Sequence, residues 1–125
     1  ALPACGYLGK THNEDNFTSI GWRISGERSF ILSSLMLWMQ KLEAIRVKAL
    51  IHCEQGYTAF NLNLDSNAHL DKDFSIEHLL KTKALTKSQM VSGENRIEII
   101  TQDKALSSEN IQGWTDHLMK ISGNK

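Results

Sequence analysis

The sequence has little of several residue types whose abundance would point to a class of protein. One proline and two cysteines occur in 125 residues, so a proline-rich linker and a disulfide framework are excluded. Lysine plus arginine and aspartate plus glutamate balance at 14 each, whereas a nucleic-acid-binding domain usually has a basic surface. No apolar run approaches the ~20 residues of a membrane-spanning helix. We therefore expect a cytoplasmic protein that binds neither nucleic acid nor a membrane.

The length and composition are those of one folded domain. Apolar residues make up 41% of the chain and charged residues 22%, which is typical of a globular core with a solvated surface. Residues 1–16 contain the proline and a polar cluster without any period, which is typical of a linker. We expect a flexible arm at 1–16 and a folded domain at 17–125.

Residues 4–11 read ACGYLGKT, and the final Gly-Lys-Thr is how a phosphate-binding P-loop ends. The motif requires Gly-x-x-x-x-Gly-Lys-Ser/Thr between a buried strand and a helix. Ala4 stands where the first glycine is needed, and the polar stretch HNEDNF follows where the helix should begin. A nucleotide site is therefore not expected in this segment.

Two periodicities divide the rest of the chain into strands and helices. Alternation of apolar and polar residues predicts half-buried strands, whereas apolar residues spaced three and four apart predict amphipathic helices. The expected strands are 17–25, 45–54, 57–65 and 96–102, and the expected helices are 29–44 capped by Ser29, a short one within 74–85, and 107–121 ended by Gly123. Gly56 would provide the positive φ of a hairpin turn between the second and third strands.

This order of elements predicts an α+β fold. We expect a two-layer sandwich, with a largely antiparallel sheet of four or more strands and two main helices packed on one face. The connection from the first strand through a helix to the second strand has ferredoxin-like or split βαβ character. If those two strands are parallel neighbours, their crossover should be right-handed.

One face of the expected sheet is a candidate docking surface. Its polar residues are Arg23, Arg46, Lys48, His52, Asn61 and Asn63, and the last five form the candidate docking set. Such a mixed face suits a protein partner, and it is equally what an ordinary solvated face of an antiparallel sheet looks like. We expect His52 to be solvated, and Cys53, its neighbour on the opposite face, to be a buried small apolar residue.

Candidate metal ligands are confined to the polar segments. His12, Glu14 and Asp15 combine imidazole and carboxylate groups, which bind zinc and similar ions. A closed zinc site uses about four well-placed ligands, so no metal is assigned with these residues alone. His69 with its neighbouring aspartates forms a similar cluster, for which a solvated loop is the simpler interpretation.

No catalytic motif is present. Cys-x-x-Cys, His-Glu-x-x-His and Gly-x-Ser-x-Gly are all absent, so we expect a protein that is not an enzyme. The alternative is a small α+β enzyme or ligand-binding module with a pocket near loop 65–75. A homo-oligomer that pairs through an edge strand is a third interpretation.

The stretch IRVKALIHCEQGYTAFNL, at 45–62, resembles the C-terminal domain of CobW-type GTPases, a family of proposed metal chaperones and insertases. That domain has a strand of the pattern Arg-x-Lys-Gly-hydrophobic-hydrophobic, a turn and a second strand. Here Arg46 and Lys48 open the pattern, with Ala49 in place of its glycine. The segment FTSIGWRIS with the following helix is similar to the family's opening strand and helix, and residues 95–121 are similar to its closing strand and helix.

The resemblance covers 17–121 and implies a non-catalytic domain. The family's P-loop and its Cys-x-Cys-Cys metal motif belong to the preceding GTPase domain, and neither occurs in this chain, so no cofactor is expected here. The implied role is that of a regulatory or docking module whose partner is the GTPase domain or a metalloprotein client. The implied process is zinc or cobalt delivery or cobalamin biosynthesis.

Overall fold

The computed structural model describes residues 7–14, 17–42, 44–63, 76–88, 93–102 and 108–124. Their elements are, in chain order, β1 (Tyr7–Glu14), β2 (Phe17–Ile24), β3 (Arg28–Phe30), α1 (Leu32–Lys41), β4 (Arg46–Cys53), β5 (Gly56–Asn63), α2 (Ile76–Lys81), β6 (Leu85–Lys87), β7 (Asn95–Gln102), α3 (Ser108–Ile121) and β8 (Ser122–Asn124). All the long strands and helices expected from the periodicities are present, with bounds shifted by a few residues.

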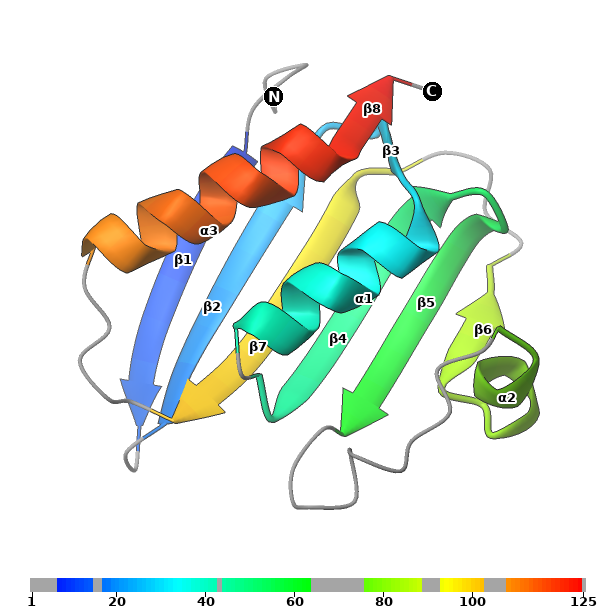
Figure 1. Cartoon of the computed structure of the whole chain (residues 1–125), viewed down its shortest axis with the longest axis horizontal. Helices are drawn as coiled ribbons and strands as arrows, with labels where there is room; N and C mark the ends of the chain where they lie inside the picture. The colour runs from blue at the N-terminus through cyan, green and yellow to red at the C-terminus, as the bar shows by residue number, and fades with distance from the viewer. Residues whose placement is uncertain are drawn as a thin grey trace.

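The strands form one sheet, in which six of them lie in the order β1-β2-β7-β4-β5-β6 (Figure 1). Every pair along this order is antiparallel. The short β3 meets only the end of β4, where Phe30 pairs in parallel with Cys53, and β8 pairs with β3. The sheet within the described residues therefore has eight strands, where the sequence predicts four or more.

The α+β class is confirmed, and both long helices lie over the same face of the sheet (Figure 1). The strands β2 and β4, which α1 connects, are parallel to each other because each is antiparallel to β7. They are not neighbours, since β7 lies between them. The arrangement therefore has the split βαβ character that the order of elements predicts, with β7 inserted between the two parallel strands.

The core lies between this sheet and the two helices. Its largest members include Trp22, Trp38, Phe30, Ile97 and Ile99, each nearly inaccessible to solvent. The rings of Trp22 and Trp38 meet edge to face with centroids 5.1 Å apart. Both indole N–H groups donate to α3, one to the Thr115 hydroxyl and the other to the Trp114 carbonyl, at 2.9 Å each. These bonds satisfy the buried polar atoms that tryptophan brings into a core.

The helix α1 begins three residues later than the sequence predicts. Ser29 is part of β3, and the N-cap residue Ile31 makes no side-chain cap. Instead, the backbone N–H of Leu32 donates to both carboxylate oxygens of Glu54, at 2.9 and 3.1 Å. An acidic group from the β4–β5 turn therefore satisfies the helix N-terminus and complements its dipole. A cap so distant in the sequence leaves no local signal.

The expectation of a flexible arm at 1–16 is wrong for residues 7–14. They form β1, which pairs with the whole of β2 and brings Glu14 opposite Phe17. The sequence contains no local signal for this strand, because Tyr7–Glu14 shows no alternation of apolar and polar residues, as is common in an edge strand.

The end of α3 is also different from the expected glycine cap. Gly123 lies in β8, directly after the helix. The Arg28 guanidinium donates to the carbonyls of Met119 and Ser122, at 3.0 and 3.1 Å, and therefore caps the last turn. Among the described helices, none is long and apolar enough to cross a bilayer.

Candidate protein-docking face

The sheet surface opposite α1 and α3, here called the open face, consists of the alternate residues of β2, β7, β4 and β5. Gly21, Glu98, Lys48 and Asn61 lie in one row, because Glu98 is the register partner of both Gly21 and Lys48, and Lys48 is the partner of Asn61. Lys48, Asn61 and Glu98 are exposed. Among the residues that the structure describes, no helix covers this row (Figure 1). The open face is therefore a surface that a partner can reach.

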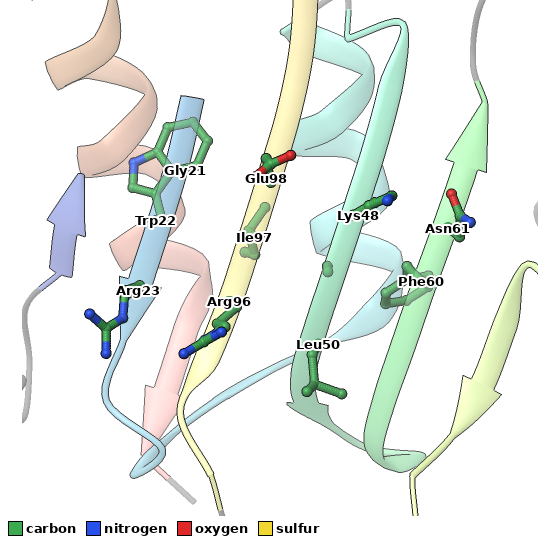
Figure 2. Close-up of a pocket in the computed structure, with 11 residues that line it drawn as sticks. Gly21, Trp22, Arg23, Lys48, Leu50, Phe60, Asn61, Arg96, Ile97 and Glu98 are labelled. Atoms are coloured by element: carbon green, nitrogen blue, oxygen red, sulfur yellow. The ribbon is translucent and has the colours of Figure 1, made fainter. Parts of the chain in front are cut away.

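A second row places two arginines side by side. Arg23 pairs in register with Arg96, and Arg96 pairs with Leu50. Figure 2 shows the two guanidinium groups at the same level on neighbouring strands. Two like charges directly opposite each other destabilise a sheet unless a counter-charge lies between them.

Glu94 provides that counter-charge. Its carboxylate accepts hydrogen bonds from Nε and Nη2 of Arg23, at 2.8 and 3.0 Å, and from Nε of Arg96, at 2.6 Å. The hydrogen bonding of Arg23, reinforced by the hydrogen bond from Arg96, holds the pKa of the Glu94 carboxyl below its usual value. The hydrogen bonding between Arg23 and Glu94 and the charge of Glu94 raise the pKa of Arg23. Glu94 therefore orients both guanidinium groups toward the same part of the open face.

Between these rows the open face is hollowed into a groove of about 820 Å³. The side chains that line it include Arg23, Arg96, Lys48, Glu98 and Asn61, and they come from four neighbouring strands (Figure 2). The side chain of Leu50, partly exposed, adds an apolar patch. The groove thus combines charged side chains with one partly exposed apolar side chain, a mixture that binding surfaces commonly have.

Gly21 accounts for part of the hollow. A Cβ atom built at this position would meet only the carbonyl oxygen of Ile97, at 4.0 Å, so the space above the backbone is open. A glycine inside a strand often marks a site where a ligand or another backbone approaches closely. On the side of β2 away from β7, the register partner of Gly21 is Lys10 of β1.

At one end of the open face, His52 departs from the sequence prediction. It is only 5% exposed, where solvation was expected. Its ring stacks on Tyr57 with centroids 4.3 Å apart, and its Nε2 lies 2.8 Å from the carbonyl oxygen of Gly93. The segment at Gly93 and Glu94 therefore crosses over this end of the sheet and covers the imidazole. The alternation of β4 correctly gives the face of His52, but the covering segment comes from 41 residues further along the chain.

Close backbone packing holds this segment in place. A Cβ on Gly26 would collide with the carbonyl of Gly93, and a Cβ on Gly93 would lie 2.6 Å from the Tyr57 hydroxyl oxygen. The Tyr57 hydroxyl donates to the Glu94 carbonyl at 2.7 Å, and burial raises the pKa of this hydroxyl. The covering segment is thus fixed by two glycines and one tyrosine.

Asn95, which is fully buried, joins the same segment to the sheet. Its Oδ1 accepts the backbone N–H of His52 at 2.8 Å, and its Nδ2 donates to the carbonyls of Ser25 and Arg28. Glu94 is the residue before Asn95, so these hydrogen bonds also fix the position of the carboxylate that orients Arg23.

The other residues singled out in the sequence are placed as follows. Arg46, Lys48, Asn61 and Asn63 are exposed on β4 and β5, so four of the five expected docking residues are accessible, and His52 is not. Cys53 is buried, as predicted.

Only some of the candidate metal ligands lie within the described residues. His12 and Glu14 belong to β1, while Asp15, His69 and the pocket expected near loop 65–75 lie outside the described residues. Within the described part of the chain, no group of three or more His, Cys, Asp or Glu residues is placed to hold a metal ion.

Sequence reasoning missed Glu94 and Arg96 as members of this face. Their importance depends on the position of β7 between β2 and β4, which periodicity does not reveal. Once that strand order is known, the register alone brings Arg96 beside Arg23 and Glu98 beside Lys48.

Comparisons of this chain with protein-family models, with curated proteins and with solved structures gave no match. The relation to CobW-type domains therefore stays a prediction from the sequence.

Proposed function

We propose that this chain is a non-catalytic docking domain of the CobW C-terminal type, which binds a GTPase domain or a metalloprotein client through its open face. In this role it would contribute to the delivery of zinc or cobalt, or to cobalamin biosynthesis. The observation that carries the proposal is the contrast between the two faces of the sheet. Both long helices pack on one face, while charged side chains and a groove occupy the other.

The order of elements supports the proposal. Strand β2, helix α1 and hairpin β4–β5 follow each other as the resemblance at 17–62 requires, and β7 with α3 closes the domain. Arg46 and Lys48, which open the family-like pattern, are both exposed on the open face. A basic pair at this position suits an acidic surface on the partner.

The experiment is a titration with the GTPase domain of a CobW-type protein, loaded with GDP or with a non-hydrolysable GTP analogue. Isothermal titration calorimetry should give saturable binding in at least one nucleotide state. The variant Lys48→Glu should weaken binding about tenfold or more, because it reverses a charge within the contact. The matched control Lys41→Glu changes an exposed lysine of α1, on the other side of the sheet, and should leave the affinity unchanged.

Two results would contradict the proposal. One is the absence of binding in both nucleotide states at concentrations of about 100 μM, beyond which a docking contact has little specificity. The other is an equal loss of affinity in Lys48→Glu and Lys41→Glu, which would place the contact elsewhere or reduce it to net charge.

A second candidate function is supported by the size of the groove. A volume of 820 Å³ lies within the range of small-molecule pockets, and its arginines would suit an anionic ligand. This candidate is favoured less, because the groove lies on the outside of a sheet and crosses four strands rather than enclosing a ligand. A small anion that saturates the groove in the absence of any protein partner would favour this second candidate.

A further inference from the structure

We propose that the groove over Gly21 receives an extended acidic segment of the partner protein, whose carboxylates contact Arg23, Arg96 and Lys48. This inference rests on the proposed docking function and names the chemistry of the docked segment. It is carried by the charge of the groove, by the geometry of its arginines and by its dimensions.

The charges of the open face are unequal. The described part of the open face carries more positive than negative side chains. The positive ones are Arg23, Arg46, Lys48 and Arg96, and the negative ones are Glu94 and Glu98. Glu94 is already shared by two arginines, at 2.6 and 2.8 Å. A guanidinium has more N–H donors than one carboxylate accepts, so both arginines retain hydrogen-bonding capacity after Glu94 is satisfied. A partner that brings carboxylates into the groove supplies the missing negative charge.

The geometry of the arginines favours a carboxylate. Glu94 and the hydrogen bonds of Asn95 hold the two guanidinium groups before any partner arrives, which lowers the ordering cost of binding. The planar fork of arginine matches a carboxylate through two parallel hydrogen bonds. Glu98, beside Lys48, favours an acidic segment over a nucleic acid, because a nucleic acid carries a phosphate at every residue, whereas an acidic segment can place an uncharged residue near this carboxylate.

The dimensions fit a short stretch of extended chain. The four strands that line the groove span roughly 14 Å, at about 4.8 Å between neighbours, which is the length of about four extended residues. Lys48 lies two residues along β4 from Leu50, the register partner of Arg96. The distance between Arg96 and Lys48 is therefore one that two alternate residues of an extended chain can match. At Gly21 the absent side chain lets the backbone of such a segment approach the sheet.

The test uses an acetylated and amidated seven-residue peptide of alternating threonine and glutamate, with the threonine–glutamine peptide as its uncharged counterpart. Proton–nitrogen NMR spectra would follow the Gly21 amide and the Nε–H groups of Arg23 and Arg96. We expect saturable shifts of these three signals with the glutamate peptide and none with the glutamine peptide. Equal shifts with both peptides, or none with either at about 5 mM, would overturn the inference, because the groove would then not recognise the carboxylates of the peptide.

Two matched pairs of variants locate the site. Gly21→Leu fills the groove without altering its charge and should weaken peptide binding about tenfold or more, by obstruction. Gly113→Leu, on α3 where a Cβ meets nothing within 4 Å, should have no effect. Lys48→Gln should weaken binding about threefold, as expected for one exposed ion pair, and Lys41→Gln should leave it unchanged. If Gly21→Leu does not fold, the lysine pair decides: equal affinities of its two members would overturn the inference.

Inorganic phosphate is the remaining probe. If phosphate saturates the same three signals at a lower concentration than the glutamate peptide, the groove is a site for small anions and the inference is overturned. If the glutamate peptide binds more tightly, the inference is supported.

Failure of this inference is distinguishable from failure of the proposed function. If the GTPase domain binds and Lys48→Glu weakens it, but the glutamate peptide moves no signal, the docking face stands and the acidic segment is wrong. If the peptide binds in the groove but the GTPase domain does not bind, the acidic segment stands and the partner is wrong.

Discussion

Adjacent residues of one strand show how differently the two faces of this sheet are used. Trp22 is 1% exposed, and its indole reaches Thr115 on α3. Arg23, the next residue, has a side chain that is 51% exposed and bonds Glu94 on the opposite side. The alternation of a β-strand thus assigns folding to one residue and surface chemistry to its neighbour. Substitutions on the two faces should therefore change different properties.

The contrast also shows where the open face is not open. His52 belongs to this face by alternation, yet it is buried under the segment at Gly93 and Glu94. The end of the face near His52 is a small second core, closed by backbone packing and hydrogen bonds rather than by a helix. The accessible part is limited to the rows at Gly21 and Arg23 and their neighbours.

The largest loss of stability is expected for a substitution on the face of the sheet that the helices cover. Trp22→Ala should lower the free energy of unfolding by about 3–5 kcal/mol, because it leaves a cavity beside Trp38 and removes the hydrogen bond that the indole donates to the Thr115 hydroxyl. Arg96→Ala, on the open face, should change stability by no more than about 0.5 kcal/mol. Urea denaturation followed by circular dichroism measures both, and equal losses would contradict the division between the two faces.

The next largest loss of stability is expected in the small second core near His52, compared with the accessible part of the open face. Asn95→Ala should cost about 2–3 kcal/mol, because it leaves the buried N–H of His52 without its side-chain acceptor. The control Asn61→Ala removes an exposed amide from β5 and should be nearly neutral. Denaturation midpoints of the two variants provide the comparison. A neutral Asn95→Ala would show that the segment at Gly93 is not part of the cooperative fold.

Substitution of two glycines, Gly26 and Gly21, should give a difference in stability of intermediate size. Gly26→Ala should destabilise the protein by about 1–3 kcal/mol, because the new methyl group would overlap the Gly93 carbonyl. Gly21→Ala, which meets only an oxygen at 4.0 Å, should be neutral or slightly stabilising, since alanine limits the unfolded chain. Thermal denaturation distinguishes them, and the reverse order would mean that the groove is closed and that Gly26 has room.

The smallest expected effect is on pH dependence. The pKa of Glu94 is lowered in the folded protein by its hydrogen bond with Arg23, so its contribution to stability is present above the pKa of the unfolded chain. That contribution is lost as the pH falls through the folded pKa. In Arg23→Gln the Glu94 pKa should rise toward its usual value, as measured by NMR titration of the carboxyl carbon. An unchanged pKa would show that Arg23 does not hold this carboxylate.

Much of the fold follows from the sequence, because periodicity reports which residues face a core. The strands around Trp22, Val47 and Ile97 and the helix around Trp114 are found from alternation and from spacings of three and four. The residues at the ends of elements are not, because their partners are distant in the chain. Glu54 caps α1 from the β4–β5 turn, 22 residues from Leu32, and Arg28 caps α3 from 91 residues away.

The docking face is predicted only in part for the same reason. Arg46, Lys48, Asn61 and Asn63 lie on one hairpin, and local alternation is enough to group them. Glu94, Arg96 and Glu98 join this face because β7 lies between β2 and β4, which is a property of topology. The burial of His52 depends on the same strand, since the covering segment leads into it.

The most direct test of the central claim compares side-chain N–H signals from the two faces in one spectrum. During titration with a CobW-type GTPase domain, the Nε–H signals of Arg23 and Arg96 should shift, whereas the indole N–H signal of Trp22, bonded to Thr115, should stay in place. The claim would be contradicted if the Trp22 signal moved while both arginine signals remained unchanged.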